Sequence, residues 1–170
     1  LVGWIRQTSA PLNVRKQAVT QIRWQLPDIG WRLVLALWPT NHGATSPPMS
    51  PRYRDWKPET PAMPVAEWID FIEHLVGLAI ELADDDAKRW GELAGRLGTL
   101  PPDARRRLLG AIEGYADPGS LTAEDRLRVW DALNQEVLRH RRFPSADWSM
   151  DDEPLVRMEA IAARLEPTSD

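Results

Sequence analysis

The chain has 170 residues, of which 43% are hydrophobic and 27% charged, a composition typical of a soluble globular protein rather than a disordered one. Its length matches one average domain and suffices to bury roughly 70% of the surface that the unfolded chain would expose. The absence of Cys excludes disulfides, thiolate zinc sites, iron–sulfur clusters and a cysteine nucleophile. The net charge of −4 argues against a general polyanion binder.

The charge is unevenly distributed along the chain. Residues 1–60 carry eight Lys and Arg against three Asp and Glu, whereas residues 61–170 carry 13 against 22. A basic first third therefore precedes an acidic remainder. The two parts can neutralise each other within the fold. The uneven distribution is equally compatible with a local basic surface.

No targeting signal is visible at the start of the chain, which lacks the basic and apolar regions of a signal peptide. The longest apolar run, near residues 33–38, is far shorter than the ~20 residues that span a bilayer. The first residue is Leu1 rather than Met, so we expect a segment of a longer, cytoplasmic protein with no membrane contact.

The first two predicted helices cover residues 11–26 and 29–38, separated by Pro27 and Asp28. In the first, Leu12, Val19, Ile22 and Leu26 recur at helical spacing. The second is apolar on most sides, which favours a position inside a core. From residue 39 to residue 64 the periodicity disappears and seven of 26 residues are Pro, which predicts a long loop of the kind that is often functional.

Residues 65–83 form the strongest helical pattern. Their polar members Glu67, Asp70, His74 and Glu81 fall on one narrow stripe, which predicts a central helix with a single solvated edge. Further helices are predicted over residues 87–97, 101–115, 122–142 and 153–165. Asp84–Asp86 are suited to cap the first of these, and Ser120 or Thr122 gives the third a capping-box-like start. The result is an all-α fold of about seven helices in a single domain, residues 1–170.

The stretch WGELAGRLGTLPPDARRRLLGAIEGY, residues 90–115, indicates an antiparallel helix pair in which Gly91 and Gly95 permit close approach. It resembles a HEAT-type repeat, one of the helix–turn–helix units that stack into α-solenoids. The resemblance covers residues 87–142 and, more loosely, residues 11–38, and it implies a scaffold or partner-binding segment of a larger multidomain bacterial protein. An irregular helical bundle fits the same pattern.

Motifs for catalysis are absent: the chain has no GxxxxGK[ST], GxGxxG, HExxH or GxSxG. Asp70 and His74 stand four residues apart on one helix face, within reach of a shared metal, but a solvated Asp–His pair explains them more simply. The acidic runs at residues 84–86 and 151–153 lack the ligand order of a calcium loop and suit helix caps. We therefore expect no metal and no cofactor.

Two arginine-rich runs are candidate binding surfaces. Arg105–Arg107 point over too wide an arc of a helix to face one partner, which favours a solvated role. Arg139, His140, Arg141 and Arg142 lie at a helix C-terminus, where the helix dipole stabilises cations, and they also form a possible basic patch for a phosphate or an acid.

The candidate binding surface is the loop over residues 39–64. Its basic residues alternate with aromatic ones, which suits stacking on nucleic-acid bases and also suits a loop laid back on its own helices. The candidate residues are His42, Arg52, Tyr53, Arg54, Trp56 and Lys57.

The nine tryptophans divide by context. Trp56 and Trp148 fall in predicted loops, where an indole is either tucked back or available to a partner. Core positions are predicted for Trp31, Trp38, Trp68, Trp90 and Trp130.

The sequence leads to one main hypothesis and two alternatives. The main hypothesis is a non-enzymatic helical module that binds a protein partner, or another domain of its parent chain, through the 39–64 loop. The first alternative is a nucleic-acid-associated module that uses this loop together with Arg139–Arg142. The second is an enzyme with its site between helices around His42 or His74.

Overall fold

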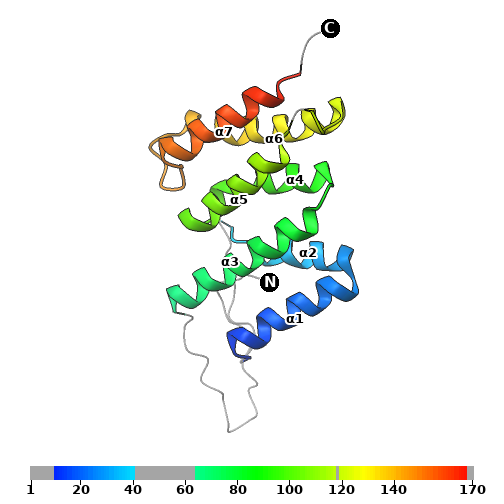
Figure 1. Cartoon of the computed structure of the whole chain (residues 1–170). Helices are drawn as coiled ribbons and strands as arrows, with labels where there is room; N and C mark the ends of the chain where they lie inside the picture. Colours follow the sequence, from blue (N-terminus) through cyan, green and yellow to red (C-terminus); the bar gives the residue numbers. More distant parts are fainter. Residues whose placement is uncertain (1–9, 41–63, 118, 168–170) are drawn as a thin grey trace. The chain divides into compact units, whose positions relative to one another are not determined.

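The computed structural model describes residues 10–40, 64–117 and 119–167, which form seven α-helices and one short 3-10 helix, η1 (Figure 1). No strand occurs in these three ranges, so the prediction of an all-α fold with about seven helices is confirmed. None of the helices described there combines the length and the apolar character needed to cross a membrane. The chain divides into two compact units, residues 1–82 and 83–170. The expectation of a single domain stays a prediction.

The first unit contains α1 (Leu12–Gln25), α2 (Pro27–Leu37) and α3 (Val65–Ala83). Leu26 ends α1 and begins α2 at once: its N–H donates to the Ile22 carbonyl and its own carbonyl accepts from the Gly30 N–H, both at 2.8 Å. Pro27 occupies the first turn of α2, where its missing N–H costs nothing. The second helix therefore begins at Pro27, two residues before its predicted start. The buried side chains of this unit include Val19, Trp31, Val34, Trp38, Phe71, Ile72, Leu75 and Val76.

The second unit contains α4 (Ala87–Ala94), η1 (Leu97–Thr99), α5 (Pro102–Tyr115), α6 (Ala123–Arg142) and α7 (Asp152–Leu165). The Trp90 and Tyr115 rings stack at 4.9 Å, and the Tyr115 hydroxyl donates to the Asp85 carbonyl just before α4. At the other end, Arg105 near the start of α5 donates to the Leu97 carbonyl just after α4, so the two helices run antiparallel. The closest packing of α4 is nevertheless on α6, which packs in turn on α7. A Cβ on Gly91 would lie 3.4 Å from the Arg128 carbonyl oxygen, so this glycine admits α6 rather than α5.

The helix predicted over residues 87–97 is shorter than expected. It ends at Ala94, and residues 97–99 form η1 instead. Side chains from neighbouring helices hold this turn: Glu136 accepts from the Gly98 N–H at 3.0 Å, and Arg105 donates to the Leu97 and Leu100 carbonyls at 3.1 and 2.8 Å. The expected solvated role of Arg105 is therefore wrong, because its guanidinium binds backbone carbonyls that a continuing helix would have used.

Two predicted helix starts are confirmed at the level of individual hydrogen bonds. The Asp86 carboxylate accepts from the N–H groups of Lys88 and Arg89 at 2.9 and 3.2 Å. At the start of α6, Thr122 Oγ1 accepts from the Asp125 N–H at 3.2 Å and donates to its carboxylate at 2.7 Å. Each cap satisfies donors that the first turn of a helix leaves unpaired.

The prediction that five tryptophans lie in the core is confirmed in part. Trp31, Trp38 and Trp90 are buried, with exposed fractions between 2% and 7%. Trp68 and Trp130 are only half-buried, so their assignment to the core is wrong in degree. Both helices that carry them keep one side towards solvent.

Candidate functional site

The loop surface predicted from the sequence lies outside the described residues. His42, Arg52, Tyr53, Arg54, Trp56 and Lys57 all belong to residues 41–63. Their role stays a prediction, and the structure offers other surfaces on which to test the same function.

The four residues of the possible basic patch at the end of α6 do not share one face. His140 points into the unit and is 1% exposed. Arg141 pairs with Asp152 at 2.5 Å and with Glu159 at 3.0 Å, both on or beside α7. Arg139 lies 4.8 Å from the ring centre of Trp148, and Arg142 lies 5.6 Å from that of Phe143. The run therefore ties α6 to its surroundings and presents no undivided basic surface.

Trp148 is tucked back rather than extended. Its ring contacts His140 and Phe143 edge to face, with centroids at 5.3 and 6.0 Å, while Arg139 covers it. The tryptophan of this connection is half-buried and serves the packing of the second unit.

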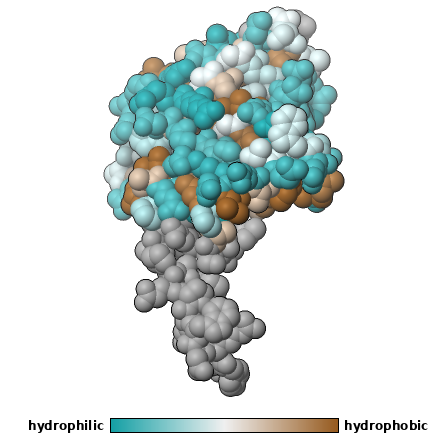
Figure 2. Space-filling view, turned by 60° about the horizontal axis from the view of Figure 1, so that its bottom comes forward, coloured by the Kyte–Doolittle hydropathy of each residue, from teal (hydrophilic) through white to brown (hydrophobic). Residues whose placement is uncertain are grey.

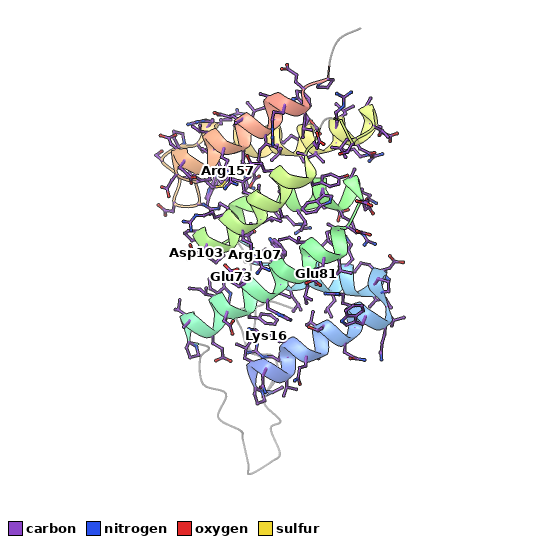
Figure 3. The ribbon with its side chains drawn as sticks, in the orientation of Figure 1. Lys16, Glu73, Glu81, Asp103, Arg107 and Arg157 are labelled. Atoms are coloured by element: carbon purple, nitrogen blue, oxygen red, sulfur yellow. The ribbon has the colours of Figure 1, made fainter. Side chains whose placement is uncertain are left out.

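The polar stripe of α3 lies along the contact with α1 and stays partly solvated, because the Asp70 and Glu81 side chains are more than half exposed. The predicted solvated edge is therefore also a line of ion pairs. Arg15 pairs with Glu67 at 3.1 Å and Lys16 pairs with Asp70 at 2.6 Å. Further along, Arg23 pairs with Glu81. Figure 3 labels Lys16 on α1 and Glu81 on α3, which belong to two of these pairs. The partners advance together along both helices, so α1 and α3 run in the same direction.

His74 belongs to the same contact. Its Nε2 lies 3.3 Å from the Lys16 carbonyl oxygen and 3.2 Å from Thr20 Oγ1. Because the carbonyl can only accept, Nε2 carries a proton and donates it there. Burial is the main reason that the pKa of His74 is lowered. In the described ranges no three His, Asp or Glu side chains converge as metal ligands, and Asp70 is engaged by Lys16.

A cleft of about 130 Å³ opens in the second unit between the first turns of α5 and α7. Arg105, Arg106 and Arg157 line it, together with Asp151 and Glu153. Arg106 pairs with Asp103 at 2.8 Å, and the Arg105 guanidinium donates to the Leu97 and Leu100 carbonyls.

The third arginine of this cleft is also engaged. Arg157 donates twice to Glu113, at 3.1 and 2.5 Å, and thereby lowers the pKa of that carboxyl. All three guanidinium groups of the cleft therefore have partners within the unit. We therefore interpret the cleft as a polar contact between α5 and α7.

The feature that sequence reasoning missed is the corner between α1 and α2. Trp24 is 70% exposed, Leu26 is 51% exposed and Ile29 is 44% exposed. Figure 2 shows hydrophobic groups scattered over a mainly hydrophilic face. Trp24, Leu26 and Ile29 place three large exposed apolar side chains within six residues of the chain. We call Trp24, Leu26 and Ile29 the α1–α2 corner.

A signal for this corner was present in the sequence. Trp24 lies off the apolar stripe that carries Val19 and Ile22, which places it on another side of the helix. Leu26 was expected on that stripe, and its exposure corrects this expectation. As the residue that ends one helix and begins the next, Leu26 no longer follows the helical period.

No protein-family model matches this chain, and neither a curated protein nor a solved structure matches it significantly. The resemblance to HEAT-type repeats stays a prediction from pattern.

Proposed function

We propose that this chain is a non-enzymatic helical module that binds a protein partner or a neighbouring domain of its parent protein. The observation that carries the proposal is the α1–α2 corner, where Trp24, Leu26 and Ile29 expose three large apolar side chains within six residues of the chain. Single exposed apolar residues are ordinary, whereas a group of them marks an interaction surface. Tryptophan in particular dominates the energetics of protein interfaces.

The corner is also held rigidly. Both backbone groups of Leu26 are hydrogen-bonded at 2.8 Å, which fixes the direction of its side chain. A Cβ on Gly30 would lie 2.8 Å from the Arg23 Cα, so the two helices are in direct backbone contact beside the corner. The Arg23 guanidinium lies 4.4 Å from the Trp24 ring centre and supports one face of the indole. A surface that is already ordered loses little entropy when a partner binds.

The helix order within each unit supports a scaffold of repeated helix pairs. In the first unit α1 and α3 run side by side in the same direction, and in the second unit α4 packs on α6 and α5 contacts α7. Contact between alternate helices is typical of two-layered helical repeats, which commonly act as binding scaffolds. The 39–64 loop, with Arg52, Arg54 and Trp56, remains a second candidate surface for the same function.

The test places a photo-crosslinking residue beside the corner. Gln25→p-benzoylphenylalanine in the parent protein is expected to capture a protein partner in cells, while Leu138→p-benzoylphenylalanine, at a residue 67% exposed in the second unit, serves as the control position. The captured protein is then purified and its affinity measured. Trp24→Ala should weaken binding about 30-fold, as truncation of an interface tryptophan typically costs about 2 kcal/mol.

The matched control is Leu138→Ala, which removes a comparably exposed apolar side chain and should leave the affinity unchanged. Both variants should melt within a few degrees of the parent protein because neither side chain is buried. Equal capture at positions 25 and 138, or equal affinity of the two variants, would contradict the proposal.

A further inference from the structure

We propose that His140 is a proton-sensitive latch, which fastens residues 143–151 and η1 to α6 when neutral and releases residues 143–151 when protonated. This inference is independent of the proposed binding function. It concerns the second unit alone and rests on the hydrogen bonds that converge on one imidazole.

Three segments meet at this ring. His140 and Glu136 lie four residues apart on α6 and are 1% and 4% exposed. The Met150 N–H donates to His140 Nδ1 at 3.0 Å, and Glu136 Oε1 lies 3.3 Å from His140 Nε2. The same carboxylate oxygen accepts from the Gly98 N–H at 3.0 Å. One side-chain pair therefore holds both the η1 turn and the connection that leads into α7.

These partners determine which ring nitrogen carries the proton. A backbone N–H can only donate, so His140 Nδ1 must accept and is unprotonated. In the neutral ring the proton then lies on Nε2, which donates it to Glu136. The observed contacts are those of neutral His140, with every polar atom of the ring satisfied.

The surroundings leave no space for rearrangement around the ring. A Cβ on Gly98 would lie 2.5 Å from both Glu136 Oε1 and His140 Nε2. The Trp148 ring meets the imidazole edge to face with centroids 5.3 Å apart, and Ser149 Oγ donates to the His140 carbonyl at 3.3 Å. Water cannot easily replace a lost partner in so closed a site.

The charged groups around His140 act in both directions. Glu136 on α6 favours the protonated ring, whereas Arg139 on α6 and Arg105 on α5 oppose it. Asp151, in the connection, acts on Arg105, and Asp147 in the same connection is exposed. Burial is the largest influence, and the pKa of His140 is lowered below the usual value of 6.5. The latch is therefore closed at neutral pH.

Protonation would place an N–H on Nδ1 opposite the Met150 N–H. Two donors cannot share a contact of 3.0 Å, so the Met150 amide loses its only acceptor on the ring. Because the folded-state pKa is lowered, the folded unit binds this proton less readily than the unfolded chain does. Stability is then highest above about pH 6.5 and falls as the pH drops towards the folded-state pKa.

The experiment is hydrogen exchange of the full chain, read by mass spectrometry over peptides that contain residues 143–151, at about pH 7.5 and about pH 5.5. After correction for intrinsic exchange, protection of this connection should fall severalfold at the lower pH, up to the roughly tenfold limit that one histidine with an open-state pKa near 6.5 can give. His140→Asn, whose amide oxygen stands at the level of Nδ1 and can accept from Met150 without titrating, should remove this difference. His74→Asn, at the half-buried histidine of the first unit, should retain this difference.

A second measurement does not depend on a variant that folds. In the wild-type protein, NMR of the ring nitrogens should show His140 titrating below the usual histidine range, with the Met150 amide shift following the same curve. Unchanged protection of residues 143–151 between the two pH values would overturn the proposal. The proposal would also be overturned if the Met150 amide shift did not change as His140 titrates. The same holds if His140→Asn lost as much protection between the two pH values as the wild-type protein.

Discussion

At the scale of single residues, the second unit depends on a position without a side chain. Gly98 donates its N–H to Glu136, and its Cα faces Glu136 and His140 so closely that a methyl group has no room. This requirement is steric, because no glycine in the described residues has a positive φ. Only the α6 side chains that pack on η1 explain why a glycine stands here.

Gly98→Ala should destabilise the protein by about 2–4 kcal/mol, because the new methyl group displaces a buried carboxylate and imidazole and breaks the bond to Glu136. The measurement is the free energy of unfolding by urea titration. Gly114→Ala is the matched control: its Cβ would meet nothing within 4 Å in α5, so the variant should be as stable as the parent or up to about 1 kcal/mol more stable. Equal effects of the two substitutions would refute the steric explanation.

At the scale of elements, side chains at the ends of helices decide where each helix begins. The turn after α3 includes Asp84 in the left-handed conformation, with φ of 45°, which Asp tolerates better than most residues. Asp86 then caps α4 with two hydrogen bonds from Lys88 and Arg89. Of three adjacent aspartates, one therefore carries the cap.

Asp86→Ala should lower the free energy of unfolding by about 1 kcal/mol, the usual cost of losing an N-cap. Asp85→Ala should change it by less than about 0.5 kcal/mol, because Asp85 is exposed and its contact with Tyr115 uses the backbone carbonyl. Both variants lose one negative charge, so the comparison separates the local contacts of Asp86, its cap bonds and its ion pair with Arg89 at 3.3 Å, from the net charge of the acidic run. Similar losses would indicate that the charge of the acidic run matters more than its geometry.

At the scale of the whole molecule, the uneven charge of the chain has a structural explanation within the first unit. The basic residues of α1 find carboxylates on α3, from Arg15 and Glu67 to Arg23 and Glu81. Part of the basic first third is therefore neutralised by the acidic part that follows it. The cations of the 39–64 loop lie outside the described residues.

The loop hypothesis yields a prediction of its own. Replacing Arg54 and Trp56 together by Ala should abolish binding of the protein partner and leave the melting temperature nearly unchanged if these residues serve recognition. Affinity titration and thermal unfolding of the same variant provide the two readouts. A large loss of stability would show instead that the loop packs on its own helices. Retained binding combined with loss in Trp24→Ala would assign recognition to the α1–α2 corner.

The sequence by itself determined the helices, because helical periodicity and capping are local. The predicted limits of α3 coincide with the observed ones, and the Thr122 cap follows directly from residue type and spacing. What the tertiary structure decided is the partner of each polar residue. The acidic residues on α3 gain their cationic partners only because α1 lies beside them, and His140 resembles part of a basic patch until its ring is seen bonded to Met150.

The exposed corner was equally beyond local reasoning. Whether Trp24 is buried depends on which side of α1 the other helices cover, and that is set by contacts far apart in the sequence. Periodicity shows that a helix has an apolar side, whereas only packing shows which apolar residues remain outside it. The physical reason is the same throughout: secondary structure follows from neighbours along the chain, while burial and pairing follow from neighbours in space.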